Sequence, residues 1–102
     1  MRFCEAEAME LTPEEIKHLE QLPDAANRVD PEVECMLEDG HTGAHVALGQ
    51  SQDFEWDKQT NWWLRWTDAG GREWTHEPVC SAESGDDMCL LPTGHEGGHY
   101  WA

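Results

Sequence analysis

Lysine and arginine are scarce in this sequence. Its 102 residues contain 6 of them against 22 aspartates and glutamates, a formal net charge of -16. The first 50 residues carry 12 acidic and 3 basic side chains, and the rest carry 10 and 3, so both halves share the imbalance. A nucleic-acid-binding protein needs clustered basic residues to replace phosphate counterions. The composition therefore argues against direct binding of DNA or RNA.

Long apolar segments and a targeting signal are also missing. No apolar run reaches the roughly 18 residues of a membrane-spanning helix. The N-terminus lacks the basic start, apolar centre and small-residue cleavage site of a secretory signal. These absences predict a cytoplasmic protein without membrane contact. In a reducing cytosol its four cysteines are better explained as free thiols or metal ligands than as two disulfides.

One eleven-residue element occurs twice. CMLEDGHTGAH begins at Cys35, and CLLPTGHEGGH begins 54 residues later at Cys89. The copies agree at six of eleven positions, which hold a cysteine, a leucine, two glycines and two histidines. Each copy has the pattern Cys-x5-His-x3-His and thus three ligands of the kind that tetrahedral zinc prefers.

Two further cysteines can supply the fourth ligand of each site. Cys80 lies nine residues before Cys89, and Cys4 lies 31 residues before Cys35. Adding one cysteine to each copy predicts two Zn²⁺ ions per chain in two complete Cys2His2 sites. The first set is Cys4, Cys35, His41 and His45, and the second set is Cys80, Cys89, His95 and His99. Two alternatives stay open: the cysteines are small core residues, or His76 replaces Cys4.

The glycines favour tight, knuckle-like loops. Gly40 and Gly94 directly precede a ligand histidine, where a chain that turns back toward an ion needs a positive φ. Gly43 and Gly97 lie between the histidines and make a helix there less favourable. A DNA-reading finger has about twelve residues between its second cysteine and first histidine, against five here. Four protein ligands also leave no position for a catalytic water, which argues against an enzyme.

The second copy resembles a C-x-L-P-x-G-H-x-G-x-H element of small, mostly uncharacterised zinc-binding proteins of actinobacteria and their phages. An aromatic residue often follows the element there, as Tyr100 and Trp101 do here. The resemblance implies zinc binding in both copies and a structural metal protein without a known reaction. The first copy departs from the pattern, because Glu38 replaces the proline.

The remaining sequence predicts a small, metal-stabilised α+β fold: a short antiparallel β-meander with one helix and two zinc-knuckle-like loops. Thr12-Pro13-Glu14-Glu15 is a capping box with proline at the first helical position, and Pro23 ends the helix. The segment FEWDKQTNWWLRWTDAGGREWTHE alternates between apolar and polar residues around a turn at 68–71, which predicts a hairpin or meander. Val46-Ala47-Leu48 is a candidate edge strand.

We expect a single domain of 1–102. In it, 1–50 form a first zinc unit with an inserted helix, 51–79 the tryptophan-rich meander, and 80–102 a second zinc unit. Most of the six tryptophans are expected in the core, although a stacking surface for a ligand is the alternative. Trp63, on the face opposite Trp62 and Trp66, is the residue we expect to be exposed. His18, beside Lys17 on the helix, is expected to be solvated.

Three functional hypotheses follow. The first is a non-enzymatic, zinc-stabilised, acidic module that binds a basic partner, which we expect to be a nucleic-acid-binding protein. A sharper version is a phage-type inhibitor that imitates the charge of DNA. The third is a small zinc enzyme with one open metal site. The acidic residues expected to bind the partner flank the zinc loops: Glu32, Glu34, Glu38, Asp39, Glu83, Asp86 and Asp87.

Overall fold

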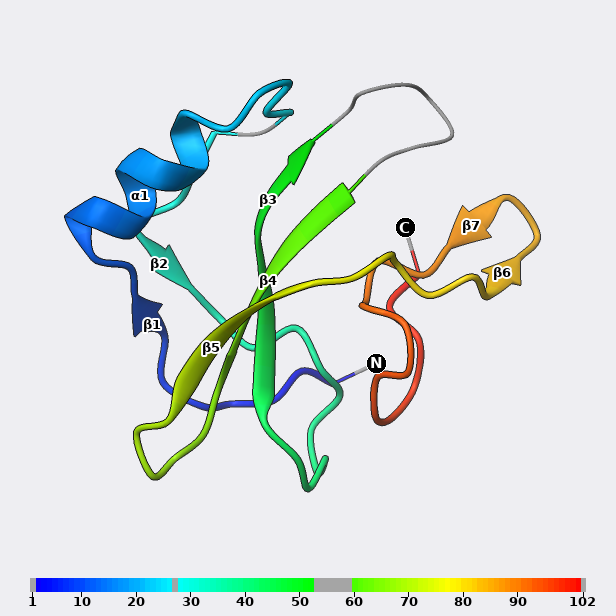
Figure 1. The fold of residues 1–102 in the computed structure, drawn as a ribbon. Coiled ribbons are helices and arrows are strands. Elements are labelled where there is room, and N and C mark those ends of the chain that lie inside the picture. Colours follow the sequence, from blue (N-terminus) through cyan, green and yellow to red (C-terminus); the bar gives the residue numbers. More distant parts are fainter. Residues whose placement is uncertain (1, 27, 53–59, 102) are drawn as a thin grey trace.

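The computed structural model describes residues 2–26, 28–52 and 60–101. It contains helix α1 (Pro13–Glu20) and antiparallel sheets of two or three strands, so the predicted α+β class is confirmed. The helix lies on one side of the central sheet and the C-terminal segment on the other (Figure 1). Within the described ranges, no helix is long and apolar enough to cross a membrane.

The central sheet is a three-stranded antiparallel meander. Strands β3 (His45–Gln52), β4 (Thr60–Trp66) and β5 (Arg72–His76) pair antiparallel in the order β3-β4-β5. The edge strand predicted at Val46 is β3, and Gly70 has a φ of 97° in the turn between β4 and β5. Phe54 and Trp56, which we placed in the meander, lie outside the described residues.

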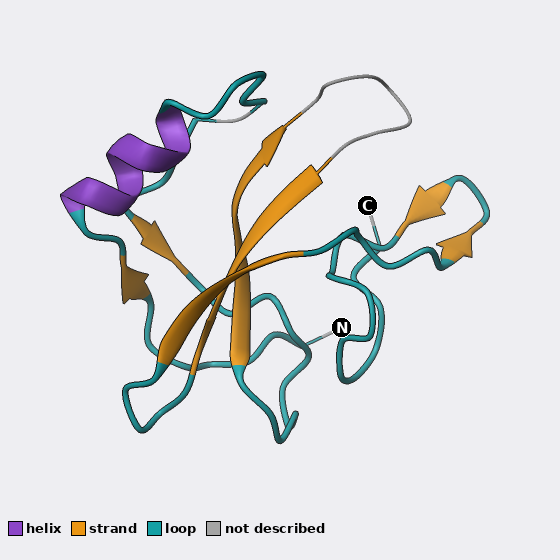
Figure 2. Ribbon diagram, viewed as in Figure 1, coloured by secondary structure: helices purple, strands orange, loops and turns teal. Residues whose placement is uncertain are grey.

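Two short ribbons flank this sheet. Strands β1 (Met9–Glu10) and β2 (Glu32–Val33) form one, before and after α1 in the chain. Strands β6 (Glu83–Ser84) and β7 (Asp87–Met88) form the other, between the last two cysteines. Figure 2 shows that the segments carrying the predicted metal ligands are mostly loops that connect or follow these strands.

Helix α1 begins at the predicted capping box. The Thr12 hydroxyl accepts from the Glu15 N–H (3.1 Å), and the Glu15 carboxylate accepts from the Thr12 N–H (2.8 Å). The helix ends at Glu20, three residues before Pro23. Its Leu19 is 2% exposed, whereas His18 points to solvent as expected.

One face of the central sheet packs against α1. A side chain at Gly49 would overlap the Trp74 ring and would approach Leu19 of the helix, so glycine lets the Trp74 ring lie over β3. Leu64 of β4 pairs with Trp74 of β5, and its side chain is fully buried. The apolar residues of this face therefore form part of the core.

The prediction that Trp63 is exposed was wrong. Its exposed fraction is 0%, and its indole N–H donates to the backbone oxygen of Glu77 (2.9 Å). Trp63 belongs to one buried cluster with Cys89 and Leu91 of the C-terminal segment, which lies on the side of the sheet away from α1 (Figure 1). Alternation assigned Trp63 to the correct face, but it could not show that this face is covered as well.

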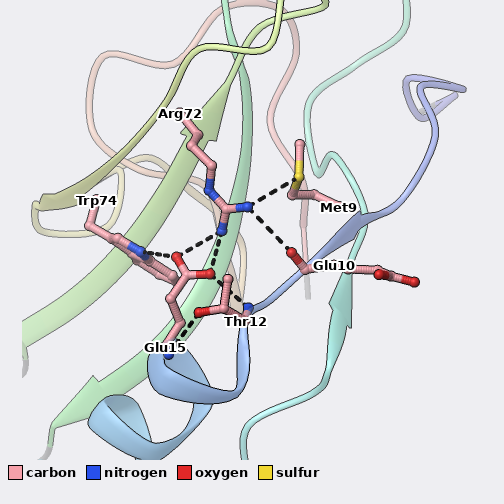
Figure 3. Close-up of polar contacts among 6 residues, drawn as sticks. All are labelled: Met9, Glu10, Thr12, Glu15, Arg72 and Trp74. Atoms are coloured by element: carbon pink, nitrogen blue, oxygen red, sulfur yellow. Dashed lines mark hydrogen bonds and ion pairs between the residues drawn. The ribbon is translucent and has the colours of Figure 1, made fainter.

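The Glu15 carboxylate connects the helix to the sheet (Figure 3). It accepts two bonds from the Arg72 guanidinium (2.5 and 2.7 Å) and one from the Trp74 indole N–H (2.6 Å). Arg72 also donates to the backbone oxygen of Glu10 in β1 (3.4 Å). Burial raises the pKa of the Glu15 carboxyl, but the bonds from Thr12, Trp74 and Arg72 together lower that pKa below its ordinary value of 4.5.

We predict that Glu15→Gln lowers the free energy of unfolding by about 1–3 kcal/mol, because the charged partner of Arg72 is removed from a partly buried network. Urea unfolding in excess zinc at neutral pH measures this loss. Glu14→Gln, an exposed neighbour with the same charge change, should change stability by less than about 0.5 kcal/mol. Equal losses in both variants would contradict the role of Glu15.

The pH dependence gives a second check. Because the folded-state pKa of Glu15 is lowered, its contribution is present above the ordinary pKa and is lost as pH falls through the folded-state value. The stability difference between the wild type and Glu15→Gln should therefore be constant from about pH 6 to 8. A difference that disappears within this range would contradict the assignment.

Candidate metal centres

The first candidate centre joins the N-terminus to the first repeated element. The Cys4 Sγ lies 3.5 Å from the His45 Nδ1, and the Cys35 Sγ lies 3.6 Å from the His41 Nε2. One ligand atom from each of the four residues lies within 4.8 Å of all the others. Cys35 and His45 are buried, and Cys4 and His41 are partly buried.

The second candidate centre repeats this arrangement near the C-terminus. The Cys80 Sγ lies 3.5 Å from the His99 Nδ1, and the Cys89 Sγ lies 3.5 Å from the His95 Nε2. The His95 Nε2 and His99 Nδ1 are 3.2 Å apart. In both centres the first histidine turns its Nε2 inward and the second its Nδ1. The structure thus gathers all eight predicted residues in the two groups that the spacing predicted.

These distances fit a tetrahedral zinc ion. With Zn–S bonds of about 2.3 Å and Zn–N bonds of about 2.0–2.1 Å, tetrahedral ligands have S···N separations of about 3.6 Å and N···N separations of about 3.3 Å. The observed separations of 3.5–3.6 Å and 3.2 Å match these values. All four cysteines are free thiols. Each cluster can therefore hold one zinc ion, two per chain.

The position of Cys4 is explained by backbone pairing. Its N–H donates to the Leu37 oxygen (2.9 Å), and the Asp39 N–H donates to the Arg2 oxygen (2.8 Å). The second centre has the same two bonds, from Cys80 N–H to the Leu91 oxygen (2.7 Å) and from Thr93 N–H to the Pro78 oxygen (3.0 Å). The duplication therefore includes the segment with the fourth ligand. The sequence analysis missed this, although the segments CEAE and CSAE, which begin at Cys4 and Cys80, agree at three of four positions.

Three of the four shared glycines have a positive φ, which was predicted for Gly40 and Gly94. Gly40 and Gly94 have φ angles of 91° and 73° directly before the first histidine, and Gly97 has a φ of 77°. Gly43 is different, because its φ is not positive. A side chain there would overlap the Glu96 carboxylate, so glycine leaves room for this carboxylate of the other loop.

Two carboxylates join the zinc loops to each other. Glu96 of the second loop accepts from the Thr42 N–H (2.9 Å), the Thr42 hydroxyl (3.0 Å) and the Gly43 N–H (2.6 Å) of the first loop. Glu38 of the first loop accepts from the Gly98 N–H of the second (3.3 Å). We call these contacts the Glu38–Glu96 clasp. The bonds from Thr42, above all, hold the pKa of Glu96 below its ordinary value.

Neighbouring groups orient the ligand histidines. The His45 Nε2 lies 2.8 Å from a carboxylate oxygen of Asp68, which follows β4, and the His95 Nδ1 lies 3.1 Å from the Glu96 backbone oxygen. Such contacts leave the other ring nitrogen unprotonated for a metal. Sequence reasoning missed Asp68 and Glu96 and gave Glu38 a different role, because these roles depend on contacts between distant segments.

Burial also affects the Cys35 thiol. It raises the pKa of that thiol, and the nearby Cys4 thiol adds to the increase. A buried thiol such as that of Cys35 ionises readily only when a cation compensates its charge, and a zinc ion would supply that compensation. His76, the alternative to Cys4, instead stacks on Trp62 with ring centroids 4.5 Å apart.

We predict two zinc ions per chain by elemental analysis and about one in Cys89→Ser. Because thiolate ligation couples metal binding to folding, Cys89→Ser should also cost more stability than the roughly 0.5 kcal/mol of a surface change. Ser81→Ala, beside Cys80, should keep both ions. A protein without zinc whose cysteines form two disulfides would contradict both centres.

We further predict that Asp68→Asn weakens zinc binding at the first centre about tenfold. This is the lower end of the effect of removing a group that orients a ligand, because the Asp68 side chain is 92% exposed. Competition with a chelator of known affinity should show one of the two ions leaving earlier than in the wild type. Asp39→Asn removes the same charge from the first zinc loop without touching His45 and should leave both affinities unchanged.

The centres combine two thiolates and two imidazoles each, and their duplicated backbone pairing makes them equivalent parts of one small zinc-stabilised domain. In comparisons with protein-family models, curated proteins and solved structures, nothing matches the chain.

Proposed function

We propose that the protein is a non-enzymatic, zinc-stabilised binding module whose acidic surface binds a basic protein. The observation that carries this proposal is the position of exposed carboxylates beside the two metal centres. Glu32 and Glu34 precede Cys35. Asp86, in the turn after β6, and Asp87, in β7, lie between Cys80 and Cys89; all four are exposed. The metal sites give these charges fixed positions on a small body.

Ion pairs within the molecule do not compensate the excess of acidic side chains. Within the described residues, the ion pairs of arginine join Arg2 to Glu5 and Asp39, Arg65 to Glu77, and Arg72 to Glu15. A zinc ion in each centre cancels only the charge of its own two thiolates. A net charge of -16 is well beyond the magnitude of about 2 to 8 that serves the solubility of a small domain. Binding of a basic partner is the simplest explanation for the negative charge that arginine and zinc leave uncompensated.

One residue of the expected binding surface has a different role. Glu38 is partly buried and accepts a bond from Gly98 in the other zinc loop, so its charge is directed into the molecule. The exposed carboxylates on either side of it are better suited to meet a partner. The proposed surface therefore consists of Glu32, Glu34, Asp39, Glu83, Asp86 and Asp87.

The alternative is a small zinc enzyme with one open metal site. Catalytic zinc usually has three protein ligands and a water in the fourth position. Each centre here brings four protein ligands together at separations that fit closed tetrahedral coordination. This geometry favours a structural role for both ions. Anion binding to the cobalt-substituted protein, which requires an open position, would favour the enzyme instead.

A sharper form of the proposal is a phage-type inhibitor that imitates the charge of nucleic acid. Carboxylates at fixed positions on a rigid body can present a potential like that of a phosphate backbone, and would attract a protein whose basic surface binds DNA. The resemblance of the second zinc loop to actinobacterial and phage proteins supports a search among actinobacterial DNA-binding proteins. DNA should then compete with this chain for the same surface.

We predict that a partner isolated from an actinobacterial lysate binds with an affinity that falls steeply with salt and is displaced by duplex DNA. Neutralising one cluster, in Asp86→Asn/Asp87→Asn, should slow association without altering folding. Glu14→Gln/Glu20→Gln makes the same charge change on α1 and is the matched control. Surface plasmon resonance at several salt concentrations measures both rates.

The salt dependence of the affinity can also contradict the proposal. An affinity unchanged between about 0.05 and 0.5 M salt, over which the screening length contracts severalfold, would contradict charge imitation. Exposed apolar side chains would then be the better candidates for the contact. They are Phe3, Met88, Leu90 and Trp101. Trp63, buried in the core, cannot take this role.

A further inference from the structure

The contacts between the two zinc loops run in both directions. Glu96 follows the metal ligand His95, and its carboxylate reaches the backbone between the two histidines of the first centre. Glu38 lies three residues after the metal ligand Cys35, and its carboxylate reaches the backbone between the two histidines of the second centre. Each loop therefore holds the other at the segment that separates its two imidazole ligands.

Close packing makes these contacts sensitive to the shape of both loops. At Gly43 a side chain would overlap the Glu96 carboxylate. At Gly97 and Gly98 a side chain would come within 3.0 Å of Glu38. The clasp therefore packs closely against both turns in their described conformations.

A metal ion stabilises those conformations. Binding of His41 and His45 to one ion fixes both ends of the short turn that carries the N–H groups of Thr42 and Gly43. These N–H groups are the donors to Glu96, whose neighbour His95 belongs to the other centre. The same reasoning applies in reverse to Gly98 and Glu38. An ion in one centre thus fixes the backbone N–H groups that bind the glutamate of the other loop.

We propose that the Glu38–Glu96 clasp couples the two centres, so that zinc in one raises the affinity of the other for zinc. Because coupling free energies are reciprocal, each ion strengthens the other by the same factor. Typical couplings between sites correspond to about 5-fold to 150-fold in affinity, and we expect about tenfold for solvent-exposed contacts. Molecules with a single ion are then less frequent than two independent sites would give.

The shared core is a second structural element that could make zinc binding at the two centres cooperative. Cys35 and Cys89 both belong to the buried core cluster, so metal-induced folding of one unit could assist the other without the clasp. Variants of the clasp distinguish the two routes. Glu96→Gln removes the charge that accepts from Thr42 and Gly43, and Gly43→Ala displaces Glu96 without any change of charge.

Native mass spectrometry of the full chain in a zinc buffer measures the coupling. At half loading, two independent sites leave at least one half of the molecules with a single ion, whatever their individual affinities, whereas tenfold coupling of equal sites leaves about one quarter. We expect fewer than half in the wild type. We expect the single-ion fraction to rise to about one half or more in Glu96→Gln and in Gly43→Ala.

Glu7→Gln is the matched control. It removes one exposed carboxylate three residues after the metal ligand Cys4, and it should keep the single-ion fraction of the wild type. A wild-type fraction of one half or more that does not rise in either clasp variant would overturn the proposal. A low fraction that persists in both clasp variants would also overturn it, and would assign the coupling to the core. This inference rests on the metal centres and not on a partner, so a failed search for a partner leaves it intact.

Discussion

Convergence of two thiolates and two imidazoles on one point, at two places in the chain, is the constraint on which this fold depends. Cys35 and Cys89 are at once metal ligands and members of the buried core, so coordination and apolar packing are parts of one structure. A chain of this size buries a modest fraction of its surface and gains much from such cross-links. The meander supplies the body against which both loops pack.

The acidic surface and the metal centres are also related. A large net negative charge disfavours the compact state through self-repulsion. A zinc ion in each centre would oppose this expansion by cross-linking the chain, although it cancels only the charge of its own two thiolates. The backbone N–H groups of the turns contribute as well, since they bind the carboxylates of Glu38 and Glu96. The fold thus tolerates a charge that would expand a less constrained chain.

Local sequence signals predicted more of the structure than long-range ones. The capping box at Thr12 located α1, and the two spaced elements located six of the eight ligand positions, because short chain segments determine both features. Assigning Cys4 to the first centre needed only a count of cysteines, but its pairing with Leu37 depends on a contact across 33 residues. The burial of Trp63 and the clasp were missed for the same reason. Each requires knowledge of which segments come together in space, which periodicity does not contain.

The two units differ most between their paired cysteines. The stretch from Cys4 to Cys35 contains β1, α1 and β2, whereas Cys80 and Cys89 are joined by the short β6–β7 ribbon, whose turn includes Gly85 with a φ of 61°. In both units the backbone bonds beside the cysteines are the same. The interval between the cysteines is therefore a place where chain length can vary without disturbing coordination. A duplicated zinc unit of this kind can acquire new elements during evolution, and the ribbon at Gly85 is a natural position for grafting a foreign peptide onto the scaffold.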